Sequence, residues 1–388
     1  MVLIGIIGKP NAGKSTLLNA VSDANAQVAN YPFTTIKPNK GIAFVFAYCP
    51  HEELNLQCKP RNSKCKEGKR LIPVNVVDVA GLVEGAHEGK GMGNQFLSDV
   101  ATADALVIVS DASGATDSEG NPCDAGNHDA VEDVSMVLNE LDQWFFDVVK
   151  RNAQKTRGKS FSEFAQSLSG LGVSQDDLKE HVSRQGLNGE LWMWSEDQLR
   201  DLAKGLRETS KPFVIAANKA DSSFAQKNIE RLENAFPNNL VVATSAESEL
   251  ALKRAHETGL IDYDGKTFTV LKELSEKQKK ALDKIKVVLE KTGSTGTQQL
   301  INSLVFNFLN MIVVYPVEDE NKYSDHFGNV LPDAILLPKG SKPVDLARAI
   351  HTDLATNFLH AVDCKKRVRV GKDYKLKDND VIKIVSTK

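Results

Sequence analysis

The chain has 388 residues, of which 26% are charged and 41% are hydrophobic, and its formal net charge is −3. This length predicts two or three domains, and the composition is typical of a globular protein in water. The small net charge argues against a protein that is basic over its whole surface, and the 5 unevenly spread cysteines argue against a disulfide framework. We find no apolar run of about 18 residues and no room for a signal peptide before the first predicted strand, so we expect a cytoplasmic protein with no membrane partner.

The first predicted strand, residues 2–7, is followed by Gly8-Lys9-Pro10-Asn11-Ala12-Gly13-Lys14-Ser15 and then by a predicted helix, residues 14–24. A strand, a glycine-rich turn and a helix in this order are the setting of a phosphate-binding loop. The glycines let backbone N–H groups approach phosphate oxygens, and the helix start adds its positive dipole end. We expect Lys14 to reach the β- and γ-phosphates and the Ser15 hydroxyl to ligate Mg²⁺.

Residues 30–39 are predicted to form a loop, because Pro32 and Pro38 disfavour a helix there. A threonine in this loop, Thr35, is placed to sense Mg²⁺ and the γ-phosphate. Such contacts would order the loop only in the triphosphate state. A simple turn is the alternative.

An unusual insertion separates the next two predicted strands, residues 41–47 and 71–77. It contains Cys49, His51, Cys58 and Cys65, which together would complete a tetrahedral Zn²⁺ shell. A metal would also explain how a polar insertion without a core stays ordered. Because a close Cys-x-x-Cys pair is absent, an ordinary basic loop with free thiols is the favoured interpretation and zinc is the alternative.

The strand at residues 71–77 ends in Asp78-Val79-Ala80-Gly81, at the edge of the sheet where α/β proteins bind ligands. We expect Asp78 to hold Mg²⁺ through water and the Gly81 N–H to reach the γ-phosphate. Leu82 follows, where Ras-like GTPases carry a glutamine that orients the attacking water. His87 is a candidate replacement for that glutamine, although a contact with solvent or backbone alone is the favoured interpretation.

After a strand at residues 105–110, the alternation of strands and helices stops. Residues 127–208 contain segments with apolar residues at helical spacing, so we predict an inserted helical domain. The predicted helices are residues 130–150, 161–169, 174–185 and 195–208.

The strand at residues 212–217 ends in Asn218-Lys219-Ala220-Asp221, which selects the base. The Asp221 carboxylate can accept from guanine N1–H and from its amino group, whereas adenine offers no such pair of donors. The Lys219 stem can lie over the purine, and Asn218 can tie this loop to the phosphate loop.

The next strand, residues 241–243, is followed by Thr244-Ser245-Ala246. Small residues here would let a backbone N–H approach guanine O6. A plain cap of the helix predicted over residues 247–258 is the alternative.

The C-terminal third changes character. Residues 275–310 predict two helices, with Ser275 and Thr295 as caps and Gly293 as the break. Beyond them, a helix at residues 343–354 interrupts short β-rich runs, which predicts a small α+β domain of the ubiquitin-like kind. The β-rich runs are residues 312–315, 334–337, 358–362 and 381–385. A basic run between residues 365 and 377 suits contact with a phosphate backbone or, equally, a solvated face.

These motifs together resemble the Obg-related GTPases, specifically the YchF/Obg-like ATPase branch with its C-terminal TGS domain. The resemblance covers nearly the whole chain. It implies an α/β P-loop NTPase with a mostly parallel sheet (residues 1–126 and 209–310), an inserted α-helical domain (127–208) and a TGS-like domain (311–388). It implies a ribosomal partner and the following contacts: phosphate at Asn11, Ala12, Gly13, Lys14, Ser15 and Thr16; Mg²⁺ at Ser15 and Thr35; the base at Asn218, Lys219, Asp221 and Ser245. The small residues at 244–246 add Ala246 as a candidate base contact.

Some members of this branch lack Asn-Lys-x-Asp and prefer ATP, whereas this chain has the motif intact. We therefore predict a GTP-binding switch with slow hydrolysis, in keeping with Leu82. Asn11 matches an asparagine that helps to hold K⁺ in some related GTPases, so K⁺ stimulation is a hypothesis that equal turnover in Na⁺ would count against. The alternatives are an ATPase of the same fold and an RNA-binding scaffold with a structural nucleotide site. No motif predicts an oligomeric state.

Overall fold

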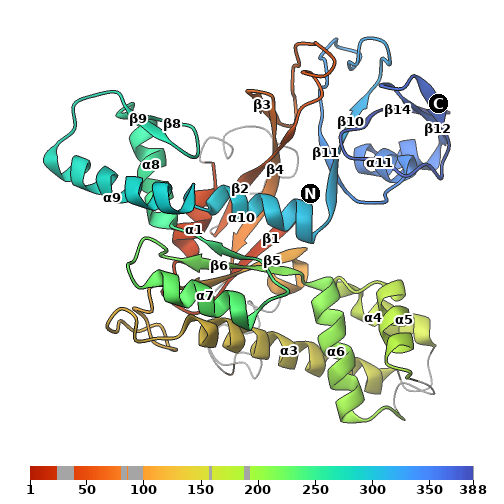
Figure 1. Cartoon of the computed structure of the whole chain (residues 1–388). Helices are drawn as coiled ribbons and strands as arrows, with labels where there is room; N and C mark the ends of the chain where they lie inside the picture. Colours follow the sequence, from red (N-terminus) through yellow and green to blue (C-terminus); the bar gives the residue numbers. More distant parts are fainter. Residues whose placement is uncertain (24–38, 80–84, 86–98, 157–159, 188–192, 388) are drawn as a thin grey trace.

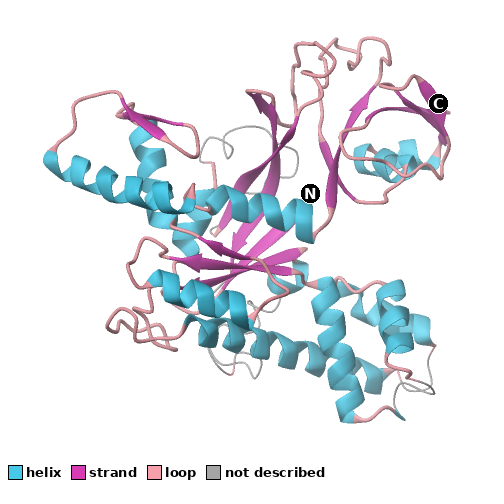
Figure 2. Ribbon diagram, viewed as in Figure 1, coloured by secondary structure: helices cyan, strands magenta, loops and turns pink. Residues whose placement is uncertain are grey.

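The computed structural model describes residues 1–23, 39–79, 85, 99–156, 160–187 and 193–387. Its centre is a mostly parallel sheet with helices on both faces (Figures 1 and 2). This arrangement confirms the predicted P-loop fold class. No helix among the described residues is both long and apolar enough to cross a bilayer.

The central sheet has the strand order β2-β4-β1-β5-β6-β7, and β3 pairs with the outer part of β4. β2 and β3 run antiparallel to β4, while the other pairs are parallel. Because β4 and β5 lie on opposite sides of β1, the ligand-binding crevice of such a sheet is expected at the end of β1. The strands are β1 (Leu3–Ile7), β2 (Lys40–Tyr48), β3 (Lys64–Lys66), β4 (Lys69–Asp78), β5 (Ala105–Asp111), β6 (Phe213–Asn218) and β7 (Val241–Ala243).

Alternate residues of the buried strands serve two separate cores. Ile7 and Ile108 join the core formed with α3 (Ala130–Lys155) and α7 (Ala225–Ala235). Ile6 and Val109 join the core on the other face, which contains residues of α1 (Lys14–Val21) and α10 (Thr297–Ser303). The sheet is thus covered on both sides, as its nearly continuous apolar strands require.

The helix α3 is 26 residues long and serves two parts of the molecule. Its first half packs on β5, and its second half packs on α4 (Phe161–Leu168) and α6 (Glu196–Ser210). The helical region is completed by a 3₁₀ turn (Ser169–Leu171) and α5 (Gln175–Arg184). Capping boxes start α4, α5 and α6, which confirms the helices predicted there.

A second projecting region was not predicted in full. α8 (Ala246–Glu257) leads into a short hairpin, β8 (Ile261–Tyr263) and β9 (Phe268–Val270), which packs with α9 (Glu276–Thr292) around a small core. The predicted cap Ser275 and break Gly293 are confirmed. The predicted cap Thr295 is wrong: Gly296 stands at the N-cap of α10, and the Thr295 hydroxyl donates to Glu249 instead. A π-helical turn (Leu304–Phe308) follows α10.

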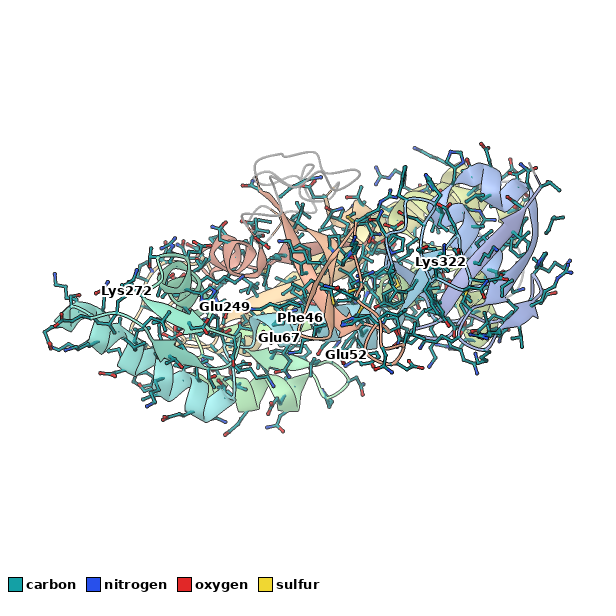
Figure 3. The ribbon with its side chains drawn as sticks, turned by 90° about the horizontal axis from the view of Figure 1, so that it is seen from above. Phe46, Glu52, Glu67, Glu249, Lys272 and Lys322 are labelled. Atoms are coloured by element: carbon teal, nitrogen blue, oxygen red, sulfur yellow. The ribbon has the colours of Figure 1, made fainter. Side chains whose placement is uncertain are left out.

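The C-terminal domain has a five-stranded sheet of order β11-β10-β14-β12-β13. The single helix predicted at residues 343–354 is wrong, because extended backbone at His351 divides it into α11 (Pro343–Ile350) and α12 (Thr352–Thr356). The strands are β10 (Met311–Val317), β11 (Ile335–Pro338), β12 (Phe358–Asp363), β13 (Val368–Val370) and β14 (Val381–Ser386). Seen from above, Lys272 after the hairpin and Lys322 of the C-terminal region lie toward opposite ends of the molecule, with Phe46, Glu52 and Glu67 between them (Figure 3).

Candidate functional site

The loop between β1 and α1 needs glycine at two positions. A Cβ at Gly8, whose φ is 149°, would lie 2.4 Å from the Val109 carbonyl oxygen, and one at Gly13, whose φ is 99°, would lie 2.3 Å from Asn218 Nδ2. Gly13 is also the N-cap of α1 and offers no side-chain oxygen to the first N–H groups of the helix. Those groups therefore remain suited to bind an anion.

Lys14 and Ser15 open α1 beside the end of β4. The Lys14 ammonium is nearly buried and donates to the Lys9 carbonyl oxygen at 2.7 Å. Burial lowers the pKa of Lys14, and the nearby Asp78 carboxylate partly opposes this shift. The Ser15 hydroxyl donates to Asp78. A hydroxyl and a carboxylate side by side are the oxygen ligands that Mg²⁺ prefers, so these residues fit the ion.

Asn218 ties three loops together from the end of β6. Its Nδ2 donates to the Ala12 carbonyl oxygen at 3.0 Å, and its Oδ1 accepts from the Ala246 N–H at 3.2 Å. Only 3% of Asn218 is exposed, so these bonds are shielded from water. The segment that carries Asp221 is thereby fixed to the phosphate loop.

Lys219 and Asp221 point to different partners. Lys219 has a φ of 61° and its ammonium lies 2.7 Å from Asp111 Oδ2, so its predicted position over a purine stays a prediction. Burial alone would raise the pKa of Asp111, but hydrogen bonds from Lys219, Ser113 and Thr116 outweigh burial and lower it. Asp111 is therefore an ionised partner for Lys219.

Asp221 is exposed, and the buried Ser245 hydroxyl donates to its Oδ1 at 2.7 Å. Ser245 precedes α8 but makes no side-chain capping bond to it. Ser245 stands at the N-cap position of α8, and the backbone N–H groups of residues 244–246 already have acceptors, so the contact of one of them with guanine O6 stays a prediction. Ser245 orients the carboxylate expected to read the base.

Sequence reasoning missed Lys9. Its side chain is fully buried, and its ammonium lies 2.8 Å from Asp133 Oδ1 and donates to the Thr116 and Asp117 carbonyl oxygens, each at 2.8 Å. Nearby, Asn11 Nδ2 donates to the Gly120 carbonyl oxygen at 2.9 Å. The segment between β5 and α3 is thus attached to the phosphate loop. The sequence signal that could have indicated this role was a lysine in a glycine-rich turn directly after an apolar strand.

Replacing Lys9 with methionine should lower the free energy of unfolding by about 3 kcal/mol, because the buried Asp133 carboxylate would lose Lys9 and keep only His128 as a basic neighbour. Thermal and urea unfolding measure this change. Lys227→Met is the matched control, since Lys227 is exposed on α7. Equal losses for the two variants would contradict the role of the buried ion pair.

Family models match most of the chain. A model described as 50S ribosome-binding GTPase matches residues 3–140, one described as the G4 motif-containing domain of YGR210-like Obg-like GTPases matches residues 216–319, and the TGS domain matches residues 327–386. A GTP-binding protein of Methanocaldococcus jannaschii is 52% identical over 100% of this chain and 99% of its own length. A ribosome-binding ATPase YchF of Mycoplasma pneumoniae is 30% identical over 68% of this chain and 74% of its own. The chain belongs to the Obg-like GTPases of the YchF branch.

Solved structures agree with this membership. The crystal structure of a GTP-binding protein from Pyrococcus horikoshii is 38% identical, with a TM-score of 0.79 over 100% of both chains. The resemblance inferred from the motifs is therefore confirmed, and so is the TGS domain at the C-terminal end. This Obg-like chain therefore belongs to a family of P-loop nucleotide hydrolases.

Part of the predicted site of this Obg-like protein lies outside the described residues: Thr35, Gly81, Leu82 and His87. Gly85 is described, and its buried N–H donates to Glu140 Oε1 on α3 at 2.7 Å. Gly85, four residues after the Asp-x-x-Gly motif, is therefore bonded to the helix that enters the helical region.

The predicted cysteine–histidine set does converge. The ligand atoms of Cys49, His51, Cys58 and Cys65 all lie within 4.8 Å of one another. The prediction of this set rested only on the presence of three cysteines and one histidine in a single insertion, because their spacing matches no standard zinc pattern. Cys65 pairs beside the first residues of β4, near the C-terminal domain, whereas Asp78 at the other end of β4 contacts Ser15, so the set is a separate site.

The basic run of the TGS domain is only partly available to a partner. Lys365 pairs with Glu53 at 2.6 Å, and Lys366 pairs with the buried Asp363. The Asp363 hydrogen bond raises the pKa of Lys366 despite some burial. The remaining basic residues are exposed: Arg367, Arg369, Lys372, Lys375 and Lys377.

Proposed function

We propose that this Obg-like protein binds GTP with Mg²⁺ at the carboxyl edge of the parallel sheet and hydrolyses it slowly to GDP and phosphate. The observation that carries the proposal is the connection between the base loop, residues 218–221, and the phosphate loop, residues 8–15. Asn218 bonds to Ala12, and Ser245 orients Asp221. A ligand with a guanine base and a phosphate chain can satisfy both loops at once.

Base choice follows from the Asp221 carboxylate. Guanine offers it N1–H and an amino group, and Ser245 holds one of its oxygens in place. Adenine offers an acceptor at N1 instead, so the carboxylate would receive no pair of donors from the base. Some relatives carry the name ATPase, and an ATPase of the same fold is the alternative.

We propose that residues 11–16 hold the phosphates, that Ser15, Thr35 and Asp78 hold Mg²⁺, and that the Gly81 N–H contacts the γ-phosphate. When bound, Mg²⁺ would neutralise charge on the β- and γ-phosphate oxygens. Lys14 would neutralise the charge that grows as water bonds to the γ-phosphorus and the bond to the β–γ bridging oxygen breaks. Hydrolysis should be slow, because Leu82 cannot orient the water.

Titration of the wild-type protein with GTP, GDP and ATP in the presence of Mg²⁺ tests the base assignment. We expect GTP and GDP to bind at least 10-fold more tightly than ATP, because a site built to hydrogen-bond a donor group of its ligand rejects an analogue that lacks this group. Equal affinities would select the ATPase alternative. Comparing GTP turnover in K⁺ and Na⁺ tests the proposed K⁺ contact near Asn11.

We further propose that the nucleotide state acts as a switch for ribosome binding in the cytoplasm. Two observations support this proposal: relatives are named ribosome-binding, and the TGS domain exposes basic residues suited to RNA phosphates. The bond from Gly85 to Glu140 offers a physical route from the nucleotide loops to α3 and the helical region.

Replacing Glu140 with alanine should weaken this route. The buried Gly85 N–H would lose its acceptor, which should lower the free energy of unfolding by about 1–3 kcal/mol. Hydrogen exchange in α5 and α6 should then differ less between the GTP-analogue and GDP states than it does in the wild type. Glu132→Ala is the control on the exposed side of the same helix, and an unchanged nucleotide-dependent difference in Glu140→Ala would rule out this route.

A further inference from the structure

The cysteine–histidine set between β2 and β4 is used by none of the chemistry above. Cys49 follows β2, His51 stands in the turn after it, Cys58 lies in the loop and Cys65 lies on β3. β2 and β3 flank β4, and their registers place Tyr48 opposite Lys69 and Cys65 opposite Arg70. Strand pairing therefore brings the two ends of the insertion together.

The distances within this set match a shared centre. His51 Nδ1 lies 3.6 Å from the Sγ atoms of both Cys58 and Cys65. Tetrahedral zinc with ordinary Zn–S and Zn–N bonds would place nitrogen and sulfur about 3.6 Å apart and two sulfurs about 3.8 Å apart. An ordinary two-centre hydrogen bond uses the single lone pair or hydrogen of this nitrogen for one sulfur, whereas a metal bound by all three atoms accounts for both distances.

The positive charge of a buried arginine beside these residues also favours a bound zinc ion. Arg70 is fully buried, and its Nε and Nη1 have no hydrogen-bond partner among the described residues. Arg70 lies within Coulomb range of Cys49 and of the half-buried Asp333. Three thiolates with one Zn²⁺ carry a net charge of −1, which would compensate the buried guanidinium.

The insertion is also the surface on which the C-terminal domain docks. The Lys59 N–H donates to the Val330 carbonyl oxygen at 2.8 Å, and the Arg61 N–H donates to the Pro332 carbonyl oxygen at 2.7 Å. Asn62 exchanges two hydrogen bonds with Ala334, at 3.2 and 3.0 Å. These docking contacts come from residues 59–62, between Cys58 and Cys65.

We propose that Cys49, His51, Cys58 and Cys65 bind one Zn²⁺, and that this ion holds residues 59–62 in the shape that docks the C-terminal domain. Thiolate and imidazole donors in a closed tetrahedral shell are typical of a structural zinc site. The insertion has little apolar core of its own, so the free energy of metal binding would stabilise its fold.

Metal analysis of protein purified without chelators tests the first half of the proposal. We expect one zinc per chain, and substitution with Co²⁺ should give the thiolate charge-transfer and intense visible bands of a tetrahedral site. Cys58→Ser should lose most of the zinc, whereas Cys123→Ser should keep it, because Cys123 is half-buried outside the set. Protein without zinc that also gives no such cobalt spectrum, or a disulfide between two of these cysteines, would overturn the proposal.

Hydrogen exchange tests the second half and uses the wild-type chain, so it does not depend on how a variant folds. Removing zinc with a chelator should speed exchange at the Lys59 and Arg61 amides and loosen the docking of residues 330–334. GTP affinity should stay unchanged, which separates this result from a failure of the nucleotide site. Unchanged exchange at Lys59 and Arg61 after complete zinc removal would overturn the docking role.

Discussion

Replacing Asp221 with alanine should weaken GTP binding about 100-fold or more, because two hydrogen bonds to a charged carboxylate would be lost. ATP binding should change little, since adenine lacks the N1–H and 2-amino donor pair that guanine offers to this carboxylate. Calorimetric titration with both nucleotides measures the difference. The phosphate loop would be untouched, because Asn218 rather than Asp221 makes the bond to Ala12.

Asp221→Asn is the sharper companion to this variant. Xanthine carries a carbonyl oxygen where guanine carries its amino group, and an asparagine amide can donate to that oxygen. The variant should therefore prefer XTP to GTP, which a general loss of folding cannot produce. Equal weakening of GTP and ATP in Asp221→Ala, without an XTP preference in Asp221→Asn, would contradict the assignment of the base contact.

Replacing Lys14 with alanine should lower kcat/KM for GTP about 1,000-fold, because the site would lose the cation that offsets charge on the γ-phosphate. Steady-state phosphate release measures the loss. Lys227→Ala, an exposed lysine on α7, should retain full activity. Circular dichroism and thermal unfolding should show that the Lys14 variant remains folded, although it loses the bond to Lys9.

Lys14→Ala also distinguishes a nucleotide-dependent switch from an RNA-binding scaffold. If the nucleotide controls ribosome binding, Lys14→Ala should no longer bind ribosomes more tightly with a GTP analogue than with GDP. An RNA-binding scaffold with a structural nucleotide site would bind ribosomes normally in spite of the substitution. Retained analogue-dependent binding by Lys14→Ala would contradict the role of Lys14 at the phosphates, whereas normal binding that does not depend on the nucleotide would contradict the switch.

Sequence reasoning predicted the central sheet well, and there is a physical reason. Strands buried on both faces read as apolar runs, and the turn at Gly8 and Gly13 has steric demands that only glycine meets. Asn218 was likewise predicted to tie the base loop to the phosphate loop, and the bond to Ala12 confirms it. Local sequence patterns were sufficient to predict the structure where the backbone geometry restricts which residue types can occupy a position.

The features that the sequence missed or left open have two causes: some elements are too short to show a pattern, and some contacts are distant in sequence. The hairpin of β8 and β9 has strands too short to show alternation. Lys9 was overlooked because its partner Asp133 lies more than a hundred residues away. The convergence of Cys49 and Cys65 depends on strand register around β4, which spacing alone does not reveal.

The most direct test of a nucleotide-dependent switch is co-sedimentation of the wild-type protein with ribosomes in three states: with a non-hydrolysable GTP analogue, with GDP and without nucleotide. A nucleotide-dependent switch should bind ribosomes with the analogue and bind them little in the other two states. Equal binding in all three states would contradict the switch and favour the scaffold, and no binding in any state would contradict the ribosomal partner.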